Sequence, residues 1–463
     1  MPNKPRIGLL GLMLELYDKA APDLRPEEEE FGSRVSGKLS EFAHVTWGGI
    51  ANTRHEVERR MEGFCADEVD LIVVVHFSYA PSLIALPALT RCNKPLLLFN
   101  TQELAGIDDG FSQGHMLRNH GMHGQQDLAN TLLRAGKPFG VVTGHWEDPA
   151  TLAELQDWAV AAATVTKLRK AEIGRIGWAF QDMGDFGLDE TAFLMKIGPH
   201  VRQVPLDLLA EGQAKASDSE VTALVADYRA QYQIAEDLSD EELVASARAE
   251  LAVRRAVDLL GLSGISVHYE VLGQDPRFAA LPFAGAARLL AEGISFGGEG
   301  DVTSAAAVLM MHHLCGLSTF SEMFTMDLAG GTVFMSHFAE GNPLLARQGQ
   351  PIQMVRREGW VGSGGISASL AFTFEPGPVT MVNLTVGSGG EFHLILTQGD
   401  AIDFLVFGQP TPHFLYRPEA PLNDFLSRYL ELGGSHHVAV SPGDQTSRVS
   451  KCAQVMGLRL DVI

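Results

Sequence analysis

The chain has 463 residues, which is more than one hydrophobic core usually supports, so two or three domains are expected. Hydrophobic residues make up 46% of it and charged residues 20%, as in an ordinary globular protein with enough apolar material for those cores. The formal net charge of -22 argues against general binding to nucleic acid or to an anionic membrane.

The apolar run near the N-terminus predicts a buried first strand and not a signal peptide. Lys4 and Arg6 precede the run, but it is short, it meets Glu15 and Asp18, and no small-residue cleavage site follows. No window approaches the roughly 18 to 20 apolar residues of a membrane helix. The four cysteines are widely spaced and form no C-x-x-C pair, which indicates reduced thiols. We therefore expect a cytoplasmic protein.

The first part of the chain, residues 1–170, predicts a Rossmann-like α/β domain. Short apolar runs favour buried strands at 6–14, 70–78, 95–100 and 139–146. Helix-like spacing of apolar residues lies between them, at 26–42, 53–66, 81–92 and 125–136. This alternation is typical of a parallel sheet with helices on both faces. A helix predicted at 148–171, with Asp148 as its cap, leads out of the domain.

A second Rossmann-like domain is expected at 171–318. It begins with the α/β pattern at 173–183 and 200–210 and continues with an acidic helix at 239–261, a strand at 264–272 and a helix at 283–293. The last part, 319–463, changes character, because its apolar runs are separated by Gly and Pro turns. Those runs lie at 330–338, 351–360, 367–377, 379–387, 391–399 and 400–408. The pattern predicts a C-terminal antiparallel β-barrel domain.

The glycine-rich stretch GISFGGEGDVTSAA, residues 293–306, raises the question of a phosphate-binding loop. Its glycines do not have the G-x-G-x-x-G spacing of a dinucleotide site, and the Gly-Lys-Ser/Thr of a P-loop is missing. A tight turn into a helix that begins near Asp301 explains the glycines. It does not explain Glu299, because a turn needs no carboxylate between two glycines.

Three further segments place ionisable residues among apolar ones. His337 lies in an apolar strand, Glu322 lies in the apolar segment TFSEMF, and the pair His436–His437 precedes another apolar strand. Each of these residues taken alone is compatible with an ordinary structural role. Burying an unpaired carboxylate is very costly, however, and two carboxylates with two imidazoles can satisfy one another by sharing a divalent cation.

The segments FGGEGD, TFSEMF, SHFAEGNP and GGSHHVAVS, in this order, resemble the L-arabinose isomerase family of aldose–ketose isomerases. The resemblance extends over most of the chain, through KPLLLFNTQEL, GMHGQQD, VVTGHWED, LYDKA and LPFAGAARLLAEGISFGGEGD. It implies that Glu299, Glu322, His337 and His437 bind a divalent metal and that the two glutamates are catalytic. It also implies a self-associated trimer or hexamer.

The resemblance implies that five residues contact the substrate, namely Leu16, Tyr17, His123, Met183 and Tyr269. The chain departs from the family at positions that would contact the hydroxyl groups of the sugar. Leu14 replaces a glutamine, His120 stands where glutamine is usual, Gly184 replaces an arginine beside Met183, and Tyr269 replaces a phenylalanine. The substrate is thus expected to be a small sugar whose identity the sequence leaves open.

The reaction implied is the interconversion of an open-chain aldose and its 2-ketose through an enediol. A divalent metal would stabilise the developing negative charge, and mixed carboxylate and imidazole ligands favour Mn²⁺, with Mg²⁺ or Co²⁺ as alternatives. Which glutamate is the base stays open. One rival hypothesis is a non-catalytic sugar-binding or sensor protein. Another, a nicotinamide-dependent oxidoreductase, rests only on the glycine stretch, so no nicotinamide is expected.

Overall fold

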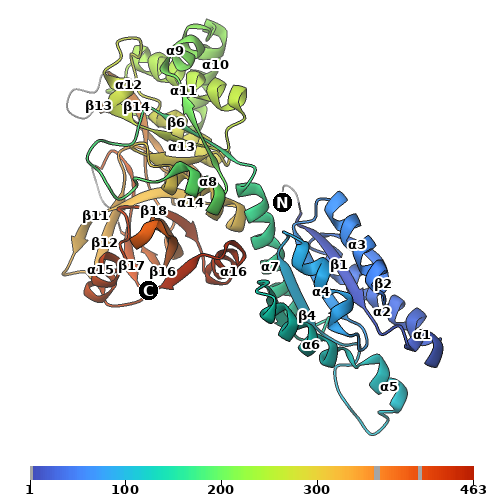
Figure 1. The fold of residues 1–463 in the computed structure, drawn as a ribbon. Coiled ribbons are helices and arrows are strands. Elements are labelled where there is room, and N and C mark those ends of the chain that lie inside the picture. The colour runs from blue at the N-terminus through green and yellow to red at the C-terminus, as the bar shows by residue number, and fades with distance from the viewer. Residues whose placement is uncertain (1–3, 359–364, 405–408) are drawn as a thin grey trace. The chain divides into compact units, whose positions relative to one another are not determined.

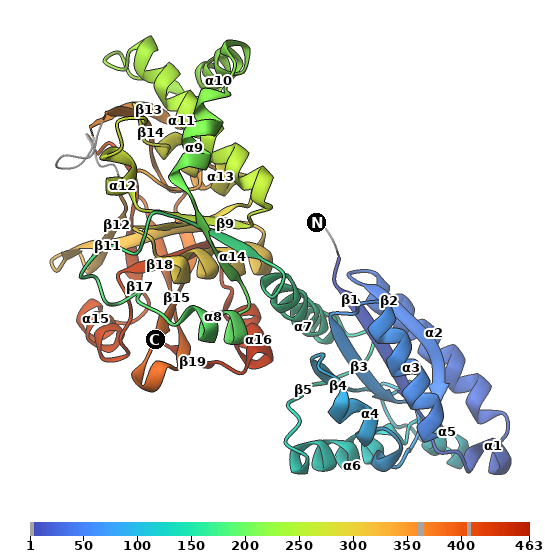
Figure 2. The same ribbon diagram turned by 45° about the horizontal axis from the view of Figure 1, so that its top comes forward.

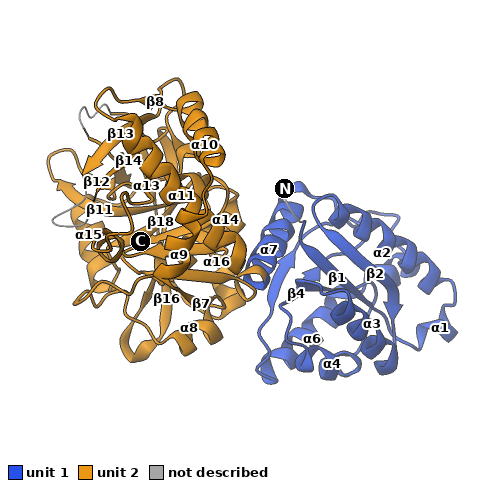
Figure 3. Ribbon diagram, turned by 90° about the horizontal axis from the view of Figure 1, so that it is seen from above, with its two compact units in different colours: residues 1–166 blue, residues 167–463 orange. Residues whose placement is uncertain are grey.

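The computed structural model describes residues 4–358, 365–404 and 409–463 (Figure 1). The chain divides into two compact units, residues 1–166 and 167–463, which Figure 3 shows in different colours. The predicted division of the second part near residue 318 stays a prediction.

Unit 1 is built on a five-stranded parallel sheet of order β2-β1-β3-β4-β5. Its strands are β1 (Arg6–Leu12), β2 (His44–Ala51), β3 (Leu71–His76), β4 (Leu96–Asn100) and β5 (Gly140–Thr143). Its helices are α1 (Tyr17–Ala20), α2 (Leu24–Ser40), α3 (Arg54–Ala66), η1 (Ser82–Ile84), α4 (Leu86–Arg91), α5 (Gln113–Arg118), α6 (Gly121–Arg134) and α7 (Pro149–Leu168). The parallel α/β domain that the sequence predicts is confirmed.

Helices cover both faces of this sheet. Apolar residues of α3, α4 and α6 form one core with alternate residues of β1, β3 and β4. Helices α2 and α7 pack on the opposite face. Gly32 of α2 lies so close to Trp47 of β2 that an added Cβ would meet the indole, and Gly140 of β5 lies equally close to Trp158 of α7. Asp148 caps α7 as predicted, because its carboxylate accepts hydrogen bonds from the amide and the hydroxyl of Thr151.

Unit 2 contains a four-stranded parallel sheet of order β10-β9-β6-β7. Its strands are β6 (Glu172–Ile176), β7 (His200–Val204), β9 (Gly264–Val267) and β10 (Ser295–Gly298). The helices of this part are α8 (Glu190–Lys196), α9 (Leu206–Ala214), α10 (Asp218–Gln231), α11 (Asp240–Leu260), α12 (Tyr269–Gly273), α13 (Phe283–Ala291) and α14 (Val302–Cys315). The second predicted parallel sheet is therefore confirmed.

The rest of unit 2 forms a ten-stranded mixed sheet of order β19-β16-β15-β18-β11-β12-β17-β14-β13-β8, in which β16 also pairs with β17. Its strands are β8 (Gln233–Ile234), β11 (Thr319–Asp327), β12 (Thr332–Ser336), β13 (Gln353–Glu358), β14 (Ile366–Thr373), β15 (Gly377–Val386), β16 (Phe392–Ile402), β17 (Pro412–Pro418), β18 (His437–Pro442) and β19 (Arg459–Val462). The short helices η2 (Pro343–Leu345), η3 (Ser388–Gly390), α15 (Leu422–Glu431) and α16 (Thr446–Met456) connect them.

The mixed sheet differs from the purely antiparallel barrel that the sequence predicts. Three of its pairings, β8–β13, β14–β17 and β16–β19, are parallel, and closure into a barrel stays a prediction. The strand predicted at 391–399 continues past its predicted end to Ile402 as β16, because Gly399 is a position of close packing and not a turn. A Cβ there would lie 2.2 Å from the carbonyl oxygen of Arg417 in β17.

Two further predictions of elements need comment. The strand predicted at 264–272 ends at Val267, and the chain turns into α12 at Tyr269. The last residues of two predicted strands, 359–360 and 405–408, lie outside the described residues.

Helix α14 lies in the centre of unit 2, between the parallel sheet and the mixed sheet (Figure 2). It packs on β9 and β10 on one side and on β15 and β18 on the other. Eleven of its residues are buried, so it is apolar nearly all round, as expected of a helix with no solvent face. Its N-terminus is therefore fixed by packing on both sheets.

Two expectations about the chain as a whole can be compared with the structure. All four cysteines are free, as the spacing of the cysteines predicts. Over the ranges that the structure describes, none of the helices has both the length and the apolar character required to cross a bilayer.

Glu28 is an acidic side chain buried inside unit 1. It lies on α2, it is 1% exposed, and neither carboxylate oxygen has a hydrogen-bond partner among the described residues. Burial raises the pKa of this carboxyl from 4.5 to about 9, and the negative charge of Glu103 adds to the effect. The folded protein therefore holds the proton of Glu28 at neutral pH.

The raised pKa of Glu28 predicts a pH-dependent stability. The folded state keeps a proton that the unfolded state releases above about pH 4.5, so stability falls as the pH rises from there toward about 9. Glu28→Gln, which mimics the protonated form, should raise the melting temperature by a few degrees at pH 8.5 and change it little at pH 5. Thermal unfolding at the two pH values measures this, with the exposed Glu30→Gln on the same helix as control. An equal shift at both pH values would contradict the prediction.

Candidate metal centre

Two of the four predicted metal ligands lie on neighbouring strands of the mixed sheet, and a third directly follows the next strand. Glu322 of β11 pairs with His437 of β18 on one side and with Ser336 of β12 on the other. His337 directly follows Ser336. The fourth, Glu299, lies in the turn between β10 and α14. The structure thus brings together residues that are separated by as many as 138 positions in the sequence.

The turn around Glu299 explains the glycine-rich stretch. Glu299 has a φ of 57°, in the left-handed region that costs a side-chain-bearing residue roughly 1 to 2 kcal/mol. Gly300 has a φ of 82°, and a Cβ on it would lie 2.2 Å from the carbonyl oxygen of Trp178. A Cβ on Gly298 would lie 2.9 Å from Cε1 of His337. The glycines therefore let the chain pass close to the imidazole and hold Glu299 in a strained position.

His437 is oriented by a buried carboxylate. Its Nδ1 lies 3.1 Å from Oδ2 of Asp301, and the other oxygen of Asp301 accepts hydrogen bonds from the amides of Thr303 and Ser304 at the start of α14. Burial would raise the pKa of Asp301, but its hydrogen bond with His437 and the other bonds lower it below the ordinary value. Nε2 of His437 is buried and has no hydrogen-bond partner within the described ranges.

His337 is held in the same way by Glu340. Its Nδ1 lies 2.6 Å from Oε2 of Glu340, which also accepts a hydrogen bond from the amide of Ala339. Burial would lower the pKa of His337, but the negative charge of Glu340 raises it above the ordinary value. The other ring nitrogen, Nε2, lies 4.0 Å from Oε2 of Glu322.

The distances suit ligands of one cation. Two atoms bound at about 2.1 Å to the same ion lie at most about 4.2 Å apart. Nε2 of His437 lies 3.9 Å from Oε2 of Glu299, and Nε2 of His337 lies 4.0 Å from Oε2 of Glu322. Two groups could hold a metal, Glu299 with His436 and His437, and Glu322 with His337 and His437. Both groups include His437, and the binding of one cation by all four predicted ligands stays a prediction.

The free donor atoms support this assignment. Oε2 of Glu299 is buried without a hydrogen-bond partner in the described part of the chain, as is Nε2 of His437. Buried polar atoms normally have partners, and a metal ion would supply one to both. Neutral imidazoles and carboxylates are a common donor set for divalent transition metals.

His436 is a residue that the sequence argument passed over in favour of its neighbour. Its Nδ1 lies 2.5 Å from Oδ2 of Asp185, and its Nε2 lies 3.6 Å from Oε2 of Glu299. Burial would lower the pKa of His436, but the hydrogen bond that it donates to Asp185 and the charges of the nearby carboxylates raise it to about 10. His436 is therefore a cation at neutral pH, beside Glu299. The doubled histidine was its only signal in the sequence.

The two orienting carboxylates, Asp301 and Glu340, were also missed as members of the site. Asp301 was interpreted only as part of a helix start, although it performs that role and holds His437 at once. Glu340 follows His337 by three residues, and this spacing in SHFAEG was the available signal.

A cavity of about 1010 Å³ in unit 2 contains part of this site. Its lining includes Glu299, Glu322 and His337, together with Met183 and Tyr269, which were predicted to contact the substrate. Burial raises the pKa of the Tyr269 hydroxyl well above its ordinary value, and the charge of Glu340 adds to this, so the hydroxyl stays protonated. The volume is at the upper end of the range for small-molecule sites.

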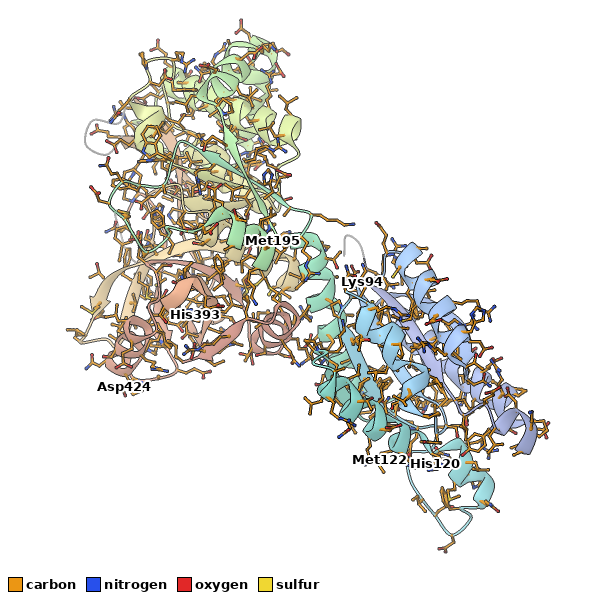
Figure 4. All side chains as sticks on the ribbon, in the orientation of Figure 1. Lys94, His120, Met122, Met195, His393 and Asp424 are labelled. Atoms are coloured by element: carbon orange, nitrogen blue, oxygen red, sulfur yellow. The ribbon has the colours of Figure 1, made fainter. Side chains whose placement is uncertain are left out.

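The other three predicted substrate contacts, Leu16, Tyr17 and His123, belong to unit 1. His123 lies on α6, where its Nδ1 is 3.3 Å from Nε2 of His120 and its ring is 4.6 Å from that of Tyr79. Figure 4 labels His120 beside Met122 at the start of this helix. The role of these residues in substrate binding stays a prediction, because the placement of the two units relative to each other is not determined.

Comparison with known proteins assigns the class and the family. Models described as the N-terminal, central and C-terminal domains of L-arabinose isomerase match residues 26–170, 180–316 and 317–459. The class is that of an aldose–ketose isomerase of sugars, an intramolecular oxidoreductase, as the sequence predicts. The chain belongs to the L-arabinose isomerase family.

The similar curated proteins cover nearly the whole chain at low identity. An L-arabinose isomerase of Mannheimia succiniciproducens is 26% identical over 91% of this chain and 87% of its own length. L-arabinose isomerase 1 of Bacillus licheniformis is 26% identical over 94% and 90%, and an enzyme of that name from Phocaeicola vulgatus is 28% identical over 95% and 89%. A periplasmic solute-binding protein of Actinobacillus succinogenes has a TM-score of only 0.18, at 13% identity, covering 68% of this chain and 92% of its own.

The orienting carboxylates generate a prediction for metal affinity. Glu340→Gln keeps the size of the side chain but removes the charge that aligns His337, so affinity for Mn²⁺ should fall roughly 10- to 100-fold. Titration of the metal-free protein with Mn²⁺, followed by electron paramagnetic resonance, measures this. The exposed Glu391→Gln serves as the matched control. Unchanged affinity in Glu340→Gln would show that the pair with His337 has only a structural role.

Proposed function

We propose that the chain is a metal-dependent isomerase that interconverts an open-chain aldose and its 2-ketose through an enediol. One observation carries the proposal. Two imidazoles, each held through Nδ1 by a buried carboxylate, direct Nε2 toward two further carboxylates that line a cavity. This arrangement provides a cation site and proton carriers together, which is what an aldose–ketose isomerisation requires.

Glu299 and Glu322 are the proposed catalytic residues. The reaction removes a proton from one carbon, returns it to the neighbouring carbon and moves a proton between the two oxygens. Two carboxylates lining one cavity can share acid and base work. Burial would raise the pKa of Glu299, but the interaction with His436, whose Nε2 lies 3.6 Å from Oε2 of Glu299, and the charges of the other nearby imidazoles lower it. Glu299 is therefore ready to accept a proton.

Glu299, Glu322, His337 and His437 are the proposed ligands of the divalent metal, with Mn²⁺ favoured and Mg²⁺ or Co²⁺ as alternatives. When bound, such an ion neutralises the negative charge that develops on the substrate oxygens as the proton leaves carbon. The residues of the chain fix the direction of the donors. Asp301 and Glu340 fix the orientation of the two imidazoles, and the turn at residues 298–300 fixes the position of Glu299.

The substrate is proposed to be a sugar. The curated relatives are named for L-arabinose, which makes this pentose the first compound to test. The rival hypothesis of a non-catalytic sugar-binding protein is not favoured, because all three parts of the chain match isomerase models. Leu16, Tyr17, His123, Met183 and Tyr269 are the proposed substrate contacts.

The resemblance further implies self-association into a trimer or a hexamer. Light scattering coupled to size exclusion should give a mass three or six times the 50.0 kDa of one chain. A stable, active monomer would contradict this expectation.

The proposed roles of the glutamates predict a loss of turnover with little loss of fold. Glu299→Gln and Glu322→Gln each remove a proton carrier and a charged metal ligand, so ketose formation should fall at least 10²- to 10⁴-fold, the range of general acid–base catalysis. The assay incubates Mn²⁺-loaded protein with a panel of aldoses and quantifies ketose by chromatography. Glu391→Gln should keep wild-type activity.

Removal of the metal tests the same proposal in another way. Treatment with a chelator should abolish ketose formation, and added Mn²⁺ should restore it. Full activity of either glutamate variant, or of the chelated protein, would rule out the proposed mechanism. Tight binding of sugars without any ketose formed in Mn²⁺ would favour the sugar-binding hypothesis.

A further inference from the structure

Two adjacent arginines of β13 face opposite sides of the strand. Arg356 pairs with Glu242 of α11, with 3.1 Å between Nε and Oε1, and with Glu358, with 2.8 Å between Nη1 and Oε1. Arg357 instead lines the cavity that contains Glu299 and Glu322. Side chains alternate along a strand, so this difference follows from the pleat.

The guanidinium group of Arg357 has no ionic partner. Among residues 4–358, 365–404 and 409–463 it forms neither a salt bridge nor a hydrogen bond, and its Nε is buried. Its Cζ instead lies 4.3 Å from the centroid of the Phe338 ring, which is a cation–π contact. Burial lowers the pKa of Arg357, and the charge of Glu340 only partly offsets this. An arginine remains charged even so, and this half-buried guanidinium has lost part of its hydration without gaining an ionic partner among the described residues.

The position of Arg357 within the cavity points to a ligand and not to the fold. It is the only lysine or arginine among the described residues that line the cavity. Phe338, on which it stacks, directly follows the candidate ligand His337. A guanidinium presents a planar fork of donors that matches the oxygens of a carboxylate or a phosphate, and stacking on an aromatic ring fixes the plane of the fork. Neutral sugar hydroxyls do not need such a group.

We propose that the substrate carries an oxyanion, a carboxylate or a phosphate, at the end remote from its carbonyl, and that Arg357 binds this group. The inference rests on the proposed function, because that function identifies the end of the substrate that reacts. It names the substrate class more narrowly: a sugar acid or a sugar phosphate, not a neutral sugar. The cavity, at about 1010 Å³, is lined by Arg357 as well as by Glu299, Glu322 and His337, and its volume is sufficient for a small sugar that carries such a group.

Binding of substrate-like compounds that do not react tests the proposal without turnover. The probes are ribitol, ribitol 5-phosphate and ribonate, titrated calorimetrically into the Mn²⁺-loaded full chain. Wild type should bind at least one of the anionic probes more tightly than ribitol. Arg357→Gln should weaken that binding roughly 10- to 100-fold, as expected for loss of charge-assisted hydrogen bonds, and leave ribitol unaffected. Arg356→Gln, the matched control on the opposite face, should behave as wild type.

The pattern of binding identifies the anion. A preference for ribitol 5-phosphate alone indicates a phosphate ester, and a preference for ribonate alone indicates a carboxylic acid. Arg357→Lys keeps the charge but not the fork, so it should retain part of the preference. If Arg357→Gln does not fold, the preference of wild type for the anion and its decrease with added salt provide the test. Equal affinity of wild type for all three probes, or a preference that survives Arg357→Gln, would overturn the proposal.

Turnover separates this proposal from the function on which it rests. If neutral aldoses are isomerised and Arg357→Gln changes neither KM nor kcat for any compound, the anion site is wrong and the isomerase stands. If anionic probes bind through Arg357 but no aldose yields a ketose, the isomerase is wrong and the anion site stands. If both hold, KM for the anionic aldose should rise in Arg357→Gln by a factor similar to the loss of binding.

Discussion

The site depends on two imidazoles that are each fixed at one nitrogen by a buried carboxylate. Asp301 holds Nδ1 of His437, and Glu340 holds Nδ1 of His337, so that both Nε2 atoms face the two candidate catalytic glutamates. A carboxylate at Nδ1 selects the tautomer, sets the ring plane and raises the basicity of the free nitrogen. A carboxylate–imidazole pair of the same geometry on the surface would contribute little to stability. Here burial prevents water from replacing either partner, so the orientation is kept.

The fold supplies this arrangement through two rigid elements. Pairing of β11 with β12 and β18 fixes three donors by register, since one residue of slippage would turn Glu322 to the other face. Packing of α14 between two sheets fixes the fourth, because the turn that carries Glu299 begins this helix. The left-handed backbone at Glu299 is stable only because these neighbours determine it. Strain at this one residue is the cost of bringing its carboxylate to the imidazoles.

Much of this could be predicted from the sequence, for identifiable reasons. The parallel sheets were predictable because their strands are buried on both faces, as in VVVHF, and read as continuous apolar runs. β2 was missed because six of its eight residues are exposed or half-exposed, which removes that signal. The predicted break at Gly399 was wrong because glycine in a sequence usually indicates a turn. Here the absence of a side chain lets the neighbouring strand β17 pack closely. The parallel pairings of the mixed sheet join distant segments and leave no local pattern.

The same contrast explains which site residues were found. Glu299, Glu322 and His337 were visible because an ionisable residue in an apolar segment needs a partner. Asp301 has an ordinary local explanation as a helix cap, and it gains its second role only from its contact with His437 across the fold. Glu340 lies three residues after His337, a spacing that does not by itself identify the two residues as partners. Arg357 is the extreme case. In the sequence it is one of two adjacent arginines on a strand, and nothing distinguishes it from Arg356. Only the direction of its side chain shows that one arginine is paired with carboxylates and the other faces a cavity. Substrate recognition is thus the part of function that sequence patterns show least, because it depends on the direction of single side chains.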